Sequence, residues 1–409
     1  MSYKTLSLLA CTVIVVSFAG GCSSPSSGSN AVHRVKESKV SQSEQKIDEL
    51  AVKAFASRGY DSGIEYATEN AKLSPSIGNG PIEVSIMQPR RQGKYPLVLY
   101  MPGLGESSDA AKNIRNAWAT SGYVVIAFQP LQDDITIMST AAAKEGDFAY
   151  LRHDRFSPEV VSSRLNALSK FIEYLKHAVI SGDTSFNNID LDHVAIVGFD
   201  LGARSAMIAA GEEVPSITNP GMSLKVASVI ALSPYADFSG SAFNSRYQKI
   251  NLPVLSITGD ADDDTRGAVP ITLHQAPFQY MPEGNKYLLL LAGASHAVIG
   301  DSVQTYEVSA PDRGEGTQSP ENGSSNKSSG RGRGGRNGKK SSGSDSNNSP
   351  MPAKRPPAGP TQRAMMEVAI AQISTAFLNA HVKNDNLAKD WLRNYSQPWL
   401  YNIGQLKEK

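Results

Sequence analysis

Cysteine is nearly missing from this chain of 409 residues, which contains only Cys11 and Cys22. Cys11 lies in an N-terminal apolar stretch that we expect to be removed on export, so the mature chain keeps one cysteine and forms no internal disulfide. Beyond residue 18 the sequence also lacks any apolar run long enough to cross a bilayer. It has no phosphate-binding loop, dinucleotide fingerprint or internal repeat. These gaps exclude a disulfide-stabilised scaffold, a protein of many membrane spans and a repeat array.

The N-terminal residues have the order of an export signal. A positive charge precedes a short apolar stretch, Leu6 to Phe18, and small residues follow. The run Ala19-Gly-Gly-Cys22 resembles the bacterial lipobox, in which the cysteine becomes the lipidated first residue of the mature chain. We therefore predict a signal peptide over residues 1–21, lipidation at Cys22 and a flexible tether over 22–43. An ordinary cleaved signal and a short uncleaved anchor are the alternatives. The prediction is an exported bacterial lipoprotein, anchored to a membrane on its periplasmic or cell-surface face.

The formal net charge of +1 does not by itself indicate a partner, but the charge is unevenly distributed. Residues 311–360 hold nine Lys or Arg against four Asp or Glu, with ten Gly, ten Ser and no aromatic residue. Such a segment buries too little apolar surface to offset the entropy of ordering, so we predict a disordered insertion. Its arginine-rich core resembles RGG-type nucleic-acid tails, but no aromatic side chain is present to stack on bases. We expect weak polyanion contact by residues 327–340 and no specific nucleic-acid binding.

Strand-like and helix-like segments alternate over the rest of the chain. This alternation predicts an α/β fold with a mostly parallel central sheet and helices on both faces. We assign residues 44–310 to one domain, which the helices of residues 361–409 close after the insertion. The expected strands are Ile82–Met87, Leu97–Tyr100, Tyr123–Phe128, Val194–Val197, Val226–Leu232, Val254–Gly259 and Lys286–Leu291. The expected helices are Gln45–Ala56, Asp109–Ser121, Pro158–Ala178, Ala364–Leu378 and Leu387–Leu392. Residues 131–157 are expected to form a long polar connection bordering the mouth of the site.

One strand ends in a motif that is typical of a catalytic turn. The apolar run Val194 to Val197 is followed by Gly198-x-Asp200-x-Gly202. This is the nucleophile elbow G-x-S-x-G with aspartate where serine is expected. A residue between such glycines sits on a sharp strand-to-helix turn, where a neighbouring Cβ would collide with backbone. The alternative is a plain strand–turn–helix connection without a catalytic role.

The residues that would assist a nucleophile at position 200 follow in the chain order that this motif requires. Asp262 lies just after the strand at 254–259, with Asp260, Asp263 and Asp264 as rivals for the same role. His296 follows the last strand and a short glycine-containing loop. The acid would orient the imidazole and stabilise its charged form. An acidic turn in solvent and a loop histidine without a role are the alternatives.

Together these stretches resemble the α/β-hydrolase superfamily. Within it they are most similar to the dienelactone hydrolase-related and platelet-activating-factor acetylhydrolase-like group, which includes lidless polyester hydrolases. The matching stretches are Tyr95–Ser108, Ile189–Ala206, Leu252–Asp262 and Tyr287–Ala297. The resemblance implies an oxyanion hole made by the backbone N–H groups of Leu104 and Leu201. It also implies an ester-type small-molecule, lipid or polyester substrate. The site is expected to have no lid, because residues 236–253 are too few to form one.

Asp200 departs from that pattern and leaves three hypotheses open. The first is a hydrolase with an esterase-like substrate, in which Asp200 is an unusual nucleophile or a base acting on water. The second is an Asp-nucleophile haloalkane dehalogenase or epoxide hydrolase, because a carboxylate is suited to displacement at saturated carbon. The chain lacks other marks of those enzymes, since Leu201 stands where they have tryptophan and Pro102 where they have histidine. The third is a degenerate, non-catalytic binding lipoprotein.

Other clusters of charged residues do not have the spacing of a known metal site. They are Asp133-Asp134, His153-Asp154 and the aspartates of residues 260–264, and we interpret them as solvated turns. We expect no metal and no cofactor. Phe199 and Tyr235 either line the pocket or pack at its edge.

Overall fold

The computed structural model describes residues 42–75, 77, 81–237, 241–263, 269–302 and 358–409. The predicted signal peptide, Cys22 and nearly all of the predicted insertion lie outside these residues. Contacts divide the chain into Met1–Gln45 and Lys46–Lys409, and the second unit holds the sheet and the site. Among the described residues, we find no helix with the length and apolar character of a membrane span.

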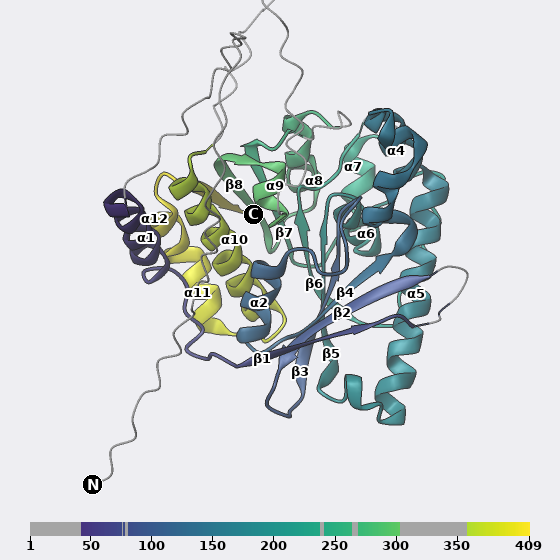
Figure 1. Ribbon diagram of the computed structural model, residues 1–409, viewed down its shortest axis with the longest axis horizontal. Coiled ribbons are helices and arrows are strands. Elements are labelled where there is room, and N and C mark those ends of the chain that lie inside the picture. Colours follow the sequence, from purple (N-terminus) through teal and green to yellow (C-terminus); the bar gives the residue numbers. More distant parts are fainter. Residues whose placement is uncertain (1–41, 76, 78–80, 238–240, 264–268, 303–357) are drawn as a thin grey trace, which may run out of the picture. The chain divides into compact units, whose positions relative to one another are not determined.

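The described part of the chain is an α/β structure built on one sheet of nine strands, in the order β1-β2-β4-β3-β5-β6-β7-β8-β9 (Figure 1). The six strands from β4 to β8 in this order pair in parallel, whereas β1, β2 and β9 pair antiparallel at the two edges. The strands are β1 (Thr68–Leu73), β2 (Ile82–Pro89), β3 (Tyr95–Met101), β4 (Val124–Pro130), β5 (Ile189–Phe199), β6 (Val226–Leu232), β7 (Val254–Ala261), β8 (Lys286–Ser295) and β9 (Gly404–Glu408).

Helices cover both faces of this sheet, as the sequence predicts. Helices α2 and α10 pack on one face, and α5 and α6 pack on the other (Figure 1). The α-helices are α1 (Gln42–Ala56), α2 (Lys112–Thr120), α3 (Ala141–Lys144), α4 (Phe148–Arg155), α5 (Pro158–Ser181), α6 (Leu201–Ala209), α7 (Phe243–Tyr247), α8 (Ala276–Tyr280), α9 (His296–Ile299), α10 (Pro360–His381), α11 (Asn386–Asn394) and α12 (Ser396–Leu400). Short 3₁₀ turns are η1 (Leu131–Asp133), η2 (Ile135–Ser139), η3 (Thr184–Phe186) and η4 (Ile271–Gln275).

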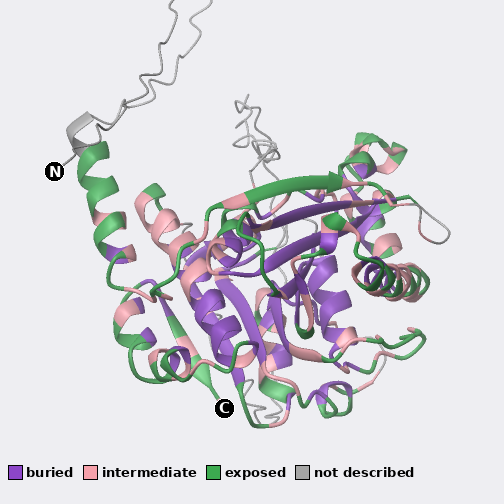
Figure 2. Cartoon of the chain, turned by 90° about the horizontal axis from the view of Figure 1, so that it is seen from below, coloured by how far each residue is buried: buried purple, intermediate pink, exposed green. Residues whose placement is uncertain are grey.

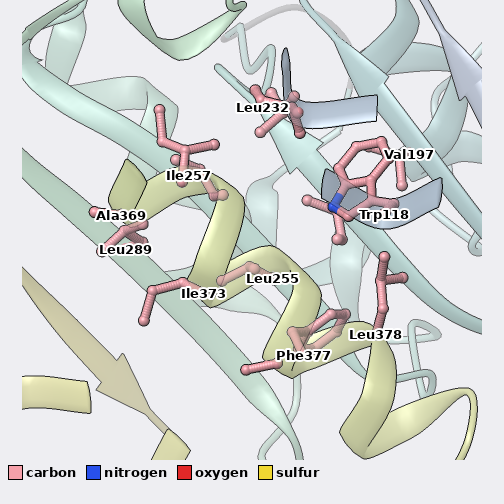
Figure 3. Close-up of a cluster of buried hydrophobic side chains, with 14 of the residues drawn as sticks. Trp118, Val197, Leu232, Leu255, Ile257, Leu289, Ala369, Ile373, Phe377 and Leu378 are labelled. Atoms are coloured by element: carbon pink, nitrogen blue, oxygen red, sulfur yellow. The ribbon is translucent and has the colours of Figure 1, made fainter. Parts of the chain in front are cut away.

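The core follows from the alternation of side chains along the central strands. Val197, Leu232 and Leu255 point to the α2/α10 face, where they meet Trp118 and Phe377 (Figure 3). The intervening strand residues point to α5 and α6. Buried residues gather in the strands and in the helix faces that touch them, and exposed residues lie outside (Figure 2). The central strands are therefore continuous apolar runs, as parallel strands buried on both faces must be.

The structure differs from the expected elements at the sheet edges, in the connection 131–157 and in the short helices α7, α8 and α12, which were not expected. The expectations omit β1 and β9 because both are edge strands with mostly polar, exposed residues and no apolar alternation. β8 continues through residues expected to form a loop and ends at Ser295, so His296 begins α9. The expected polar connection 131–157 contains two 3₁₀ turns and the helices α3 and α4.

The C-terminal end of α10 generates a prediction about stability in acid. Burial lowers the pKa of His381 from 6.5 to about 4, and its Nε2 is buried without a hydrogen-bond partner. Because the unfolded state takes up a proton first as the pH falls, this residue contributes stability above pH 6.5 that is lost between 6.5 and about 4. The loss at pH 5 is about 2 kcal/mol.

His381→Phe preserves the ring contacts with Phe377 and Tyr287, whose centroids lie 4.8 and 5.6 Å away. Urea unfolding at pH 7.5 and pH 5 should therefore show a smaller acid loss in this variant than in the parent, by about 2 kcal/mol. Equal losses in the two proteins would show that His381 does not titrate in this way.

Candidate functional site

Three side chains that lie far apart in the sequence meet at the carboxyl edge of the sheet. Asp200 follows β5, Asp262 follows β7 and His296 follows β8. Nδ1 of His296 lies 2.9 Å from Oδ1 of Asp262, and Nε2 lies 4.0 Å from Oδ1 of Asp200. The structure therefore brings together the three residues predicted from the sequence. The imidazole lies between two carboxylates.

The backbone at Asp200 explains the glycines of the elbow. Asp200 has φ 52° and ψ −112°, a region that non-glycine residues rarely adopt. A Cβ on Gly198 would lie 2.1 Å from the carbonyl oxygen of Gly202, and one on Gly202 would lie 1.9 Å from that of Met101. Both positions therefore require glycine. The turn places Asp200 at the N-terminus of α6, beside the oxyanion-hole candidate Leu201, which is fully buried.

The contact between Asp262 and His296 is reinforced by two hydroxyl groups. Ser233 Oγ donates to Asp262 Oδ1 at 3.0 Å and lies 3.1 Å from His296 Nδ1, while Thr258 Oγ1 donates to Oδ2 at 2.7 Å. Burial alone raises the pKa of Asp262, but the hydrogen bond and charge of His296, aided by His274 and Thr258, outweigh it and hold that pKa below its ordinary value. Asp262 is thus ionised at neutral pH, and Nδ1 of His296 carries a proton that it donates to this carboxylate.

The rival acids make other contacts or lie outside the described residues. Asp260 accepts a hydrogen bond from the backbone N–H of Gly293. Asp263 donates its own backbone N–H to Ala261 at 2.7 Å. Asp264 is not among the described residues. Asp262 contacts the imidazole directly, with Oδ1 2.9 Å from His296 Nδ1.

The predicted oxyanion donor Leu104 contacts Asp200 itself. Its backbone N–H donates to Oδ2 of Asp200 at 3.3 Å. The preceding N–H, that of Gly103, donates to Glu106 Oε2 at 2.9 Å. Two consecutive amides of one loop therefore bind two carboxylates.

Buried side chains from β4 and α5 fix the shape of this loop. Gln129 Nε2 lies within 3.2 Å of the carbonyl oxygens of Gly103, Glu106 and Asp133. Arg164 donates to Pro102 O at 3.1 Å and to Asp133 Oδ2 and Gln129 Oε1 at 2.9 Å. Because Gln129 and Arg164 bind these carbonyl groups, the peptide planes of the loop are fixed. The Leu104 N–H therefore points toward Asp200. The interpretation of Asp133 as part of a solvated turn is wrong, because its side chain is fully buried and forms an ion pair with Arg164.

Glu106 links this loop to the segment that follows His296. Its Oε1 accepts a hydrogen bond from Ser302 Oγ, and its Oε2 accepts the Gly103 N–H. Burial raises the pKa of Glu106, although both hydrogen bonds act against that rise. The Glu106 carboxyl group therefore connects the loop that carries Leu104 to the segment that follows His296.

Arg152 on α4 is a site residue that the sequence reasoning missed. Its Nη1 lies 3.1 Å from Asp200 Oδ1, and the two side chains are only 2% and 3% exposed. The guanidinium lies 4.2 Å from the ring centroid of Phe156 and 5.6 Å from that of Tyr235. No motif marks Arg152, because it lies in the irregular connection between β4 and α5. The sequence gives one indication of its role: Arg152 lies in the segment 131–157, which is expected to border the mouth of the site.

The two aromatic residues considered from the sequence both touch the site. Phe199 lies 4.7 Å from the His296 ring between centroids and supports one face of it. Tyr235 packs against Phe156 at 4.7 Å and lies below Arg152 and Arg204. The neighbouring cluster His153-Asp154 is on the outer side of α4, where Asp154 pairs with Arg155. Among the described residues, no group of three or more His, Cys, Asp or Glu side chains is placed to hold a metal ion.

Ser233 provides a test of backbone strain at this site. Its φ is 50°, a left-handed conformation that costs energy for serine and not for glycine. Ser233→Ala and Ser233→Gly lose the same hydroxyl group, but only glycine relieves the strain. Urea unfolding should show the Gly variant to be more stable than the Ala variant by about 1 kcal/mol, with both less stable than the parent. A Gly variant no more stable than the Ala variant would contradict a strained backbone at this position.

Comparison with models of known protein families gives no match, and comparison with curated protein sequences also gives none. The function is therefore inferred from the residues and distances described above. The features that carry most information are the buried ion pair at Asp200, the Leu104 amide and the His296–Asp262 contact.

Proposed function

We propose that the protein is a lipid-anchored hydrolase of the α/β-hydrolase fold, which cleaves a bond at a saturated carbon through an alkyl ester on Asp200. One observation carries the proposal: the two oxygens of Asp200 have different surroundings. Oδ2 accepts the Leu104 N–H, whereas Oδ1 lies 4.0 Å from Nε2 of His296. The lipid anchor is supported by the sequence around Cys22.

The first step needs only the carboxylate. Oδ1 of Asp200 attacks the carbon, a C–O bond forms, and the leaving group departs with its electron pair. An ionised carboxylate needs no base for this step. Arg152, 3.1 Å from Oδ1, is the counter-ion of this carboxylate before the attack.

The second step uses the imidazole and the backbone donor. Nε2 of His296 takes a proton from water, and the water oxygen attacks Cγ of the Asp200 ester. Negative charge develops on Oδ2, which already accepts the Leu104 N–H at 3.3 Å. The ester then breaks, and the alkoxide takes the proton from His296. The Asp200 carboxyl group, which now contains one oxygen atom from water, releases its remaining proton to solvent and returns as a carboxylate. Asp262 holds the imidazolium in place throughout.

The ester-type substrate implied by the resemblance receives less support from this geometry. An ester carbonyl would need the Leu104 N–H for its own oxyanion, and Oδ2 of Asp200 already binds that donor. Attack of a carboxylate on an ester would also give an anhydride, which is a high-energy intermediate. We therefore propose halides, epoxides or similar small electrophiles in place of esters.

A second candidate function is binding without turnover. The specific observation in its favour is that Asp200 is only 2% exposed and paired with Arg152. A carboxylate enclosed in this way resembles a structural ion pair that has replaced a lost nucleophile.

Isotope labelling separates these functions. The full-length protein is incubated in H₂¹⁸O with a panel of bromoalkanes, epoxides and short-chain p-nitrophenyl esters. The proposal predicts release of an alcohol or diol, with ¹⁸O entering the Asp200 peptide over many turnovers, as mass spectrometry would show. His296→Gln blocks the second step, so this variant should accumulate the alkyl adduct on Asp200.

The matched control is Asp200→Ser, which should not become alkylated by the same substrates. If this variant gains esterase activity that the parent lacks, the scaffold is competent for acyl transfer and the parent is not an ordinary esterase. Ester cleavage by the parent with an unlabelled Asp200 would contradict the displacement route. Absence of turnover together with tight binding of a small molecule would favour the second candidate.

A further inference from the structure

The imidazole of His296 lies near several carboxyl groups. Asp262 contacts Nδ1 at 2.9 Å, and Asp200 lies 4.0 Å from Nε2. Glu106, on the loop beside Leu104, is close enough for its charge to interact with that of the imidazole. The charge of His274 helps to lower the pKa of Asp262. Each carboxylate favours the protonated ring, and a protonated ring accepts no proton from water.

One buried cation opposes this charge. The Arg152 guanidinium lies 3.1 Å from the same Asp200 oxygen that lies near the imidazole, and both partners are nearly inaccessible to solvent. Screening by water is weak at such a place, so the charge of one group strongly affects the next. An elbow serine is neutral, and the Asp200–Arg152 pair is neutral as a unit.

We propose that Arg152 is a positioning residue that acts through Asp200 on His296: in the resting enzyme it cancels the charge of Asp200, so that Nε2 is unprotonated when the second step begins and can act as a base. The inference rests on the proposed function for its purpose, but the electrostatic effect on the imidazole does not depend on turnover. This role of Arg152 also explains why its guanidinium is packed between two aromatic rings. The contacts with Phe156 and Tyr235 hold the guanidinium in place when Oδ1 becomes engaged with substrate.

The test follows the net charge beside the imidazole through four proteins. Histidine labelled with ¹³C at Cε1 is incorporated into the full-length chain, and the His296 signal is identified by its loss in His296→Gln. NMR titration then gives the pH midpoint of this ring. The four proteins are the parent, Arg152→Met, Asp200→Asn and the double variant.

The expected midpoints follow the charge. Arg152→Met leaves Asp200 uncompensated and should raise the midpoint by about one pH unit, while Asp200→Asn leaves Arg152 uncompensated and should lower it by about one unit. The double variant removes both charges and should return close to the parent. A purely structural role for Arg152 predicts no such return. Arg155→Met is the matched control, because Arg155 is on the same helix but pairs with Asp154 and Asp133, and it should leave the midpoint unchanged.

Two outcomes would overturn the inference: equal midpoints in all four proteins, or a double variant that stays with one of the single variants. If Arg152→Met does not fold, the comparison of Asp200→Asn with the double variant carries the test, and the double variant should titrate about one unit higher. A titration that follows charge in a protein without turnover would support the inference and contradict the proposed function. Turnover of substrate with a His296 midpoint that stays the same in all four proteins would support the proposed function and contradict the inference.

Discussion

The ion pair between Arg152 and Asp200 is the interaction on which the rest of the site depends. Asp200 sits in a strained backbone conformation at the end of β5, and its carboxylate is nearly without solvent. A buried charge of this kind is costly unless a partner compensates it. Arg152 provides that compensation from α4, and the Leu104 N–H and the N-terminus of α6 add to it. The packing of α4 and the chemistry at Asp200 therefore constrain each other.

The surrounding structure holds each group of the site from a different element. Parallel strands deliver Asp200, Ser233, Asp262 and His296 to one edge of the sheet because every one of these residues follows a strand that runs in the same direction. Gln129 and Arg164 fix the loop that carries Leu104, and Glu106 ties that loop to the segment after His296. Buried hydrogen bonds to backbone carbonyls and to the Glu106 carboxyl group thus help to set the distances at the site.

Much of this arrangement could be predicted from the sequence, and the missing parts have physical causes. Buried parallel strands are apolar runs, so β3 to β8 are visible, and the steric requirement for Gly198 and Gly202 identifies the elbow around Asp200. Asp262 and His296 follow from chain order. Arg152 could not be predicted, because its role arises from the way a polar connection folds back over the site. Ser233 could not be predicted either, because a serine gives no indication in the sequence that its backbone is left-handed.

The central claim is that Asp200 and Arg152 form one buried, mutually compensating pair, and a double-mutant cycle in urea tests it most directly. The free energy of unfolding is measured for the parent, Arg152→Leu, Asp200→Leu and the variant with both changes. Removal of one partner leaves a buried charge, so each single change should cost about 3 kcal/mol or more. The double change should cost clearly less than the sum, with a coupling of about 2 kcal/mol. Additive losses, within about 0.5 kcal/mol, would contradict the account.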